Sequence, residues 1–105
     1  MTVAMLIDNP NGSQEIYEQL RERIGLEKPA GGIFHVAGPS PNGGWRVIEV
    51  FSSEDAARRF VTERLAPAFQ ALGAPSPPPP EFWPVHSYMT GDPPAPASAK
   101  EQSDR

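Results

Sequence analysis

His35 and Glu49 are the two residues of this sequence whose types and spacing most clearly allow chemistry. They lie in two β-compatible runs, Ile33 to Ala37 and Trp45 to Phe51, separated by a loop rich in Gly, Pro and Asn. This pattern predicts a β-hairpin. A register centred on Asn42 places His35 directly across from Glu49. A carboxylate beside an imidazole orients the ring and stabilises its protonated form, so we expect His35 to move a proton and Glu49 to orient it.

The same register divides the predicted hairpin into two faces. One face carries Phe34, Val36, Ile48 and Val50, and we assign this all-apolar face to the helices. His35 and Glu49 then fall on the opposite face, among apolar residues, and we expect a second copy of the chain to cover this face. A satisfied polar pair buried at a dimer interface is the structural alternative to a catalytic pair.

Other side chains are candidates for substrate binding. We expect Trp45, Phe51 and Trp83 to hold an apolar molecule, although aromatic residues at strand ends also serve interface packing. An oxygen that gains negative charge needs hydrogen-bond donors, and the candidates are Asn9, His86 and Tyr88. His86 and Tyr88 share one face of the last predicted strand, but the alternate residues of that strand form an equally acceptable inner row.

The elements that must position these residues follow from turn and cap signals. Thr2 to Ile7 predicts a strand, and a turn-rich segment follows it. Asn11 or Ser13 caps a first helix with an apolar stripe, and Gly25 ends that helix. Ser52 or Ser53 opens a second helix after the hairpin.

The second predicted helix ends at Gly73, and Pro67 is expected to kink it. Residues 75–81 are a proline-rich connector. Strand character resumes from Phe82 to Thr90, with Pro84 confining this strand to an edge or an unpaired position. We expect residues 1–90 to form one domain and residues 91–105 a disordered tail.

The predicted order is β-α-β-β-α-β, a ferredoxin-like α+β arrangement in which both helices cover one face of a four-stranded antiparallel sheet. The other sheet face is also apolar. A chain of 105 residues with such a face is expected to form a homodimer.

Composition excludes several classes of function. The net charge is −4 and the basic residues are scattered, so we expect no nucleic acid partner. The sequence has no cysteine, and its N-terminal apolar stretch is too short for a signal peptide or a membrane span. We therefore expect a cytoplasmic protein with no membrane partner. Two histidines without a ligand-spacing motif predict no metal, and the glycine pairs are turn residues rather than phosphate cradles, so we expect no cofactor.

Four segments carry a family resemblance: the opening strand with Asp8-Asn9, the hairpin GGIFHVAGPSPNGGWRVIEVF, the helix start SSEDAARRF and the closing FWPVHSYM. Over residues 1–90 the layout resembles the dimeric α/β-barrel superfamily, particularly small antibiotic-biosynthesis-monooxygenase-like proteins. The resemblance implies two sheets face to face in a dimer and a pocket in each subunit. Members include cofactor-independent monooxygenases acting on quinol or polyketide substrates, polyketide cyclases and haem-degrading enzymes. The haem-degrading pattern requires a histidine in the second helix, which is missing here.

The expected function is a cofactor-independent monooxygenase acting on a small apolar, aromatic or polyketide-like molecule. Two alternatives stay open: a polyketide cyclase or isomerase that works by proton transfer, and a non-catalytic ligand-binding or assembly module. The interior distinguishes them, because a solvent-connected cavity beside His35 and Glu49 favours chemistry and a filled interior favours assembly.

Overall fold

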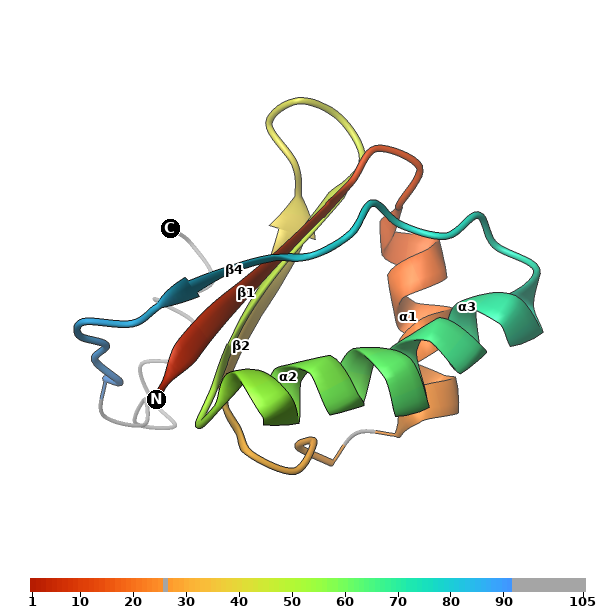
Figure 1. The fold of residues 1–105 in the computed structure, drawn as a ribbon. Helices are drawn as coiled ribbons and strands as arrows, with labels where there is room; N and C mark the ends of the chain where they lie inside the picture. The colour runs from red at the N-terminus through yellow and green to blue at the C-terminus, as the bar shows by residue number, and fades with distance from the viewer. Residues whose placement is uncertain (26, 92–105) are drawn as a thin grey trace, which may run out of the picture.

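The computed structural model describes residues 1–25 and 27–91. Four strands form one antiparallel sheet in the order β2-β3-β1-β4, and the helices pack on one face of it (Figure 1). The strands are β1 (Val3–Asn9), β2 (Gly32–Pro39), β3 (Trp45–Phe51) and β4 (Glu81–Pro84). The helical elements are α1 (Gln14–Ile24), α2 (Glu54–Phe60), the π-helical turn η1 (Val61–Leu65) and α3 (Ala66–Leu72). The predicted α+β class and element order are confirmed.

The predicted hairpin register is also confirmed. Phe34 pairs with Val50, and His35 pairs with Glu49, with one irregularity between Gly32 and Phe34. Since paired residues share a face, the rows of the sheet can be followed across its strands. One row runs His35, Glu49, Met5 and Phe82, and the next runs Phe34, Val50, Ala4 and Trp83.

The predicted assignment of the two faces is wrong. Met5 and Phe51 are fully buried beneath the helical layer, so the row of His35 and Glu49 faces the helices. Phe34 and Val36 lie on the open face and are 42% and 48% exposed. Register determines which residues share a face. The side that receives the helices depends instead on the handedness of the crossover from β1 through α1 to β2, which is right-handed in nearly all proteins. The apolar pattern does not decide it, because both faces are apolar enough to be buried.

Both helical segments begin at the serine caps that the sequence allows. The Ser13 hydroxyl accepts a hydrogen bond from the Ile16 amide at 3.1 Å, and the Ser53 hydroxyl accepts one from the Ala56 amide at 3.1 Å. These bonds satisfy amides that lack an intrahelical acceptor. Gly25 ends α1 with a φ of 98°, in the region that favours glycine.

The predicted kink near Pro67 takes the form of a π-helical turn. Proline has no N–H to donate to the carbonyl four residues earlier, so the α-helical pattern cannot run through it unchanged. In η1 the Ala66 amide instead donates to the Val61 carbonyl, five residues earlier. Phe69 follows in α3 and is buried against Leu20 of α1.

The last strand is shorter than predicted. β4 covers Glu81–Pro84 and pairs with β1 at the sheet edge, as the proline requires. Pro84 has no N–H, and beyond it one backbone hydrogen bond from Val85 to Thr2 continues the contact. The predicted continuation to Thr90 is therefore wrong. Residues 75–80 carry no helix or strand, and the predicted tail lies, except for Gly91, outside the described residues.

Candidate functional site

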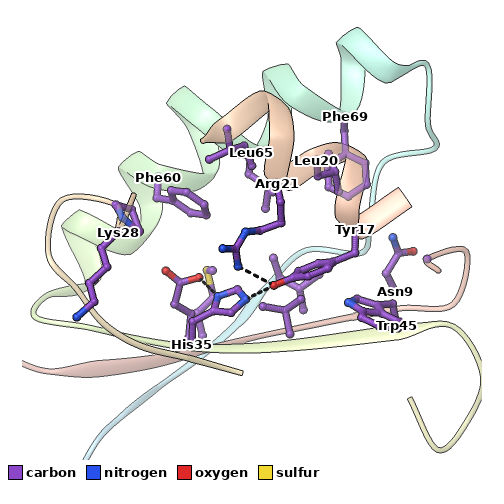
Figure 2. Close-up of a pocket in the computed structure, with 18 of the residues that line it drawn as sticks. Asn9, Tyr17, Leu20, Arg21, Lys28, His35, Trp45, Phe60, Leu65 and Phe69 are labelled. Carbon is purple, nitrogen blue, oxygen red and sulfur yellow. Dashed lines mark hydrogen bonds and ion pairs between the residues drawn. The ribbon is translucent and has the colours of Figure 1, made fainter. Parts of the chain in front are cut away.

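A pocket of about 380 Å³ lies between the helix-facing side of the sheet and the helical layer. Met5, Ile7 and Val47 contribute to it from the sheet, and Leu20 and Phe60 from the helices (Figure 2). The lining is predominantly apolar, with a few polar groups that converge on one region. Such a composition fits a small, largely apolar ligand.

A chain of four hydrogen-bonded side chains crosses the pocket from α1 to the sheet (Figure 2). Arg21 Nη1 donates to Tyr17 Oη at 3.0 Å. Tyr17 Oη lies 2.7 Å from His35 Nε2, and His35 Nδ1 lies 2.8 Å from Glu49 Oε1. The Glu49 side chain is 5% exposed, whereas the His35 side chain is 33% exposed. The series of hydrogen-bonded side chains therefore starts at a buried carboxylate, and its next member, His35, lies at the pocket surface.

For a neutral His35 ring, the partners determine the direction of each hydrogen bond. An ionised carboxylate only accepts, so His35 donates Nδ1–H to Glu49. In the neutral imidazole Nε2 is then the acceptor, and it accepts the Tyr17 hydroxyl proton. Tyr17 in turn accepts from Arg21, which only donates. Every bond of the chain is satisfied with a neutral His35, and both nitrogens of its ring are engaged.

Trp45 and Asn9 form the end of the pocket near the tip of the hairpin. The Trp45 and Tyr17 rings lie 5.4 Å apart between centroids. Among the described residues the buried Trp45 Nε1 has no hydrogen-bond partner. The Asn9 side-chain oxygen accepts from the Asn11 amide at 3.1 Å and so helps to shape the turn into α1. Asn9 and Trp45, both predicted to bind substrate, thus line the same pocket as His35 and Glu49.

The other four predicted binding residues do not line this pocket. Phe51 is fully buried and packs on Phe60, with ring centroids 5.9 Å apart, so it belongs to the core. Trp83 pairs with Ala4 and therefore lies in a row of the open sheet face. His86 and Tyr88 are exposed and lie beyond β4, because that strand ends at Pro84. Within this chain the structure does not bring these four residues to the pocket, and their part in substrate binding stays a prediction.

Tyr17 and Arg21 are pocket residues that the sequence analysis did not identify. Tyr17 belongs by its spacing to the apolar stripe of this helix, a pattern that predicts packing rather than chemistry. The available signal was their spacing of four on α1, which puts both side chains on one helix face. Their partner His35 follows Tyr17 by 18 residues, and only the packing of α1 on the sheet brings the two together.

The described residues contain no group of three or more side chains suited to hold a metal ion. His86 lies outside the pocket and so is not placed to act as a third ligand with His35 and Glu49. In the described part of the chain, no helix is both long and apolar enough to pass through a membrane.

Comparison with solved structures gives several matches that cover most of this chain. A Chloroflexus aurantiacus protein, provisionally described as an antibiotic biosynthesis monooxygenase, matches with a TM-score of 0.58 and 12% identity, covering 87% of this chain and 100% of its own. The cofactor-independent oxygenase SnoaB from Streptomyces nogalater matches with a TM-score of 0.52 and 16% identity over 86% and 95%. The Streptomyces coelicolor monooxygenase ActVA-Orf6, solved with nanaomycin D, matches with a TM-score of 0.50 and 25% identity over 87% and 92%.

The chain therefore has the ferredoxin-like α+β fold of the antibiotic-biosynthesis-monooxygenase-like proteins, and the resemblance inferred from its sequence is confirmed at the level of the fold. No protein-family model matches the sequence, and the search of curated proteins gave no match. A fold shared by several activities does not choose a reaction, so the reaction must be argued from the pocket.

Proposed function

We propose that this protein is a cofactor-independent monooxygenase that acts, as a homodimer, on a small aromatic or polyketide-like molecule with an acidic C–H or O–H group. The observation that carries the proposal is the buried Glu49 carboxylate, bonded to a His35 ring that is open to an apolar pocket. A solvent-connected cavity is also the feature that distinguishes a small-molecule site from an assembly module. Similarity in fold to proteins described as monooxygenases adds support.

The reaction balances without a cofactor when the substrate itself supplies the electrons. Removal of one proton from a CH₂ group that lies between two aromatic rings and opposite a ring ketone leaves a carbanion whose charge is delocalised onto the ketone oxygen as a phenolate. The carbanion transfers electrons to O₂ and forms a C–O bond, giving a peroxide. The peroxide regains a proton and loses water as the second C–H bond breaks, which leaves a ketone. One oxygen atom enters the product and the other leaves as water.

The residues of the pocket suit the proton steps of this reaction. His35 receives the first proton and returns it to the peroxide, while Glu49 holds the ring and balances the imidazolium charge. Asn9 and Trp45 lie at the end of the pocket, where the Asn9 amide and the Trp45 Nε1–H are donors for a substrate oxygen. The apolar lining excludes water, which otherwise competes for the carbanion.

Oxygen uptake with anthrone as the probe tests this proposal. We expect the wild-type protein to consume one O₂ for each anthraquinone formed, and His35→Gln and Glu49→Gln to slow turnover by about 100-fold or more, the usual contribution of an acid–base group. His86→Gln is the matched control because His86 is exposed and lies outside the pocket.

Other outcomes would contradict oxygenation. Conversion of a polyketide-like probe without oxygen uptake, still dependent on His35, would favour the cyclase or isomerase alternative, which needs the same proton transfer. Tight binding of aromatic probes with no conversion of any of them would favour the binding module. Equal oxygen uptake by wild type and His35→Gln would remove His35 from the mechanism.

A further inference from the structure

Both ring nitrogens of His35 are already engaged in hydrogen bonds, and this limits how a substrate can deliver a proton to it. Nδ1 is bonded to Glu49 and Nε2 to the Tyr17 hydroxyl. A substrate in the pocket thus meets no free nitrogen of this ring. The group that stands between the substrate and the ring nitrogen is the phenolic oxygen of Tyr17, which also lines the pocket.

We propose that Tyr17 is a catalytic residue that relays the substrate proton to His35, and that Arg21 stabilises the negative charge on oxygen during the transfer. This inference rests on the proposed function, because it concerns the proton step of that reaction. It adds a residue that touches the substrate and a preference for substrates that ionise to a phenolate or enolate.

The hydrogen-bonding capacity of Tyr17 Oη fits a relay. A phenolic oxygen has one proton and two lone pairs. The proton is directed to His35 Nε2 at 2.7 Å, and one lone pair accepts from Arg21 Nη1 at 3.0 Å. No other described residue is bonded to this oxygen, so the second lone pair is left to accept the substrate proton.

The transfer balances in protons and charge. As the substrate proton moves to Tyr17 Oη, the O–H bond of Tyr17 breaks and its proton forms the N–H bond at His35 Nε2. Tyr17 ends neutral, His35 ends as the imidazolium beside the Glu49 carboxylate, and the substrate ends as an anion. Return of the proton to the peroxide follows the same bonds in reverse.

Arg21 provides the positive charge that this arrangement needs. Its guanidinium donates to Tyr17 Oη and lies 5.8 Å from the centre of the Tyr17 ring. Among residues 1–25 and 27–91, no ion pair engages Arg21. An uncompensated guanidinium at the pocket wall stabilises the transient negative charge on Tyr17 and the anionic oxygen of the substrate.

Exchange of anthrone C10 hydrogens with D₂O under anaerobic conditions isolates the proton step from oxygenation. We expect Tyr17→Phe to slow exchange by about 100-fold or more while keeping the ring contacts with His35 and Trp45. Arg21→Gln should slow exchange by about 10-fold, and Arg23→Gln, an exposed arginine of the same helix, should leave it unchanged. Near-UV circular dichroism and the melting temperature of Tyr17→Phe check that the variant is folded.

Four results would contradict the proton relay through Tyr17 or the oxygenation that it serves. If His35 accepts the substrate proton directly, Tyr17→Phe uncovers Nε2, and exchange stays equal or becomes faster, which overturns the relay. A second readout is independent of turnover: the ¹⁵N chemical shift of His35 Nε2 should change in Tyr17→Phe, and an unchanged shift would overturn the hydrogen bond itself. Wild-type exchange without oxygen uptake would retain the relay and refute oxygenation, whereas no wild-type exchange would refute both.

Discussion

The hydrogen bond between His35 and Glu49 serves the stability of the fold and also suits proton transfer. Its carboxylate is almost completely buried, and among the described residues its hydrogen-bond partner is His35. A buried carboxylate without a partner destabilises a fold by several kcal/mol. The bond to His35 is therefore needed for stability, whatever the protein does. Stabilising Glu49 does not require the His35 ring to be accessible from the pocket. This accessibility therefore favours a role for His35 in proton transfer.

A second ion pair, between Asp8 and Arg46, gives a residue-scale prediction about acid stability. Arg46 Nη2 donates to Asp8 Oδ2 at 2.7 Å, and this hydrogen bond, helped by one from Ser40, lowers the pKa of Asp8 below its usual value of 3.8. A carboxyl group whose pKa is lower in the folded state stabilises the fold above its unfolded pKa. That contribution is lost as the pH falls through the lower, folded value.

We therefore expect Asp8→Asn to lower the free energy of unfolding at pH 7 and to have a smaller effect near pH 3, where the carboxyl group of the unfolded chain is already largely protonated. Urea unfolding of both proteins at the two pH values measures the difference. An Asp8→Asn effect that is the same at both pH values would show that the ion pair does not supply this stability.

At the scale of elements, the turn between β2 and β3 positions the end of the pocket. Gly43 and Gly44 both have positive φ values, 94° and 86°. A Cβ atom added at Gly44 would lie 2.1 Å from the Asn9 carbonyl oxygen, whereas one added at Gly43 would have no neighbour within 4 Å. Gly44 therefore lets the hairpin tip pack closely against the segment that carries Asn9.

The two glycines form a matched pair for mutation. We expect Gly43→Ala to cost about 1 kcal/mol, the usual penalty for a left-handed conformation. Gly44→Ala should cost clearly more, because backbone atoms of the residue 9–10 segment must move, and it should weaken binding of an aromatic probe near Asn9 and Trp45. Thermal unfolding and fluorescence titration measure the two effects, and equal costs would contradict the close approach.

The elements also show which parts of the site were predictable from sequence. The His35–Glu49 pairing followed from alternation and a central turn, which are local signals. Which face of the hairpin the helices cover was not predictable in this way, because apolar side chains occupy both of its faces. The place of Tyr17 in the pocket was not predictable, because His35, which its hydroxyl group contacts, comes from another element. His86 was misplaced because the strand ends at Pro84, while the run of β-compatible residues continues past it.

At the scale of the whole molecule, the open sheet face leads us to expect that the protein works as a dimer rather than as a single chain. Two cross-strand rows on this face are apolar over most of their length: Phe34, Val50, Ala4 and Trp83 in one row, and Val36, Ile48 and Leu6 in the next. Phe34, Val36 and Trp83 are each exposed by more than 40%. A contiguous apolar sheet face of this kind favours self-association through a two-fold axis.

We expect analytical ultracentrifugation at micromolar concentration to give the mass of two chains for the wild type and of one chain for Val36→Glu, because the new carboxylate would be buried without a partner. Gln19→Glu, which adds the same charge on the exposed side of α1, should remain dimeric. Since the pocket lies within one chain on the opposite side of the sheet, the monomeric variant should still bind an aromatic probe. A wild-type mass of one chain, or a dimeric Val36→Glu, would show that this face is not the interface.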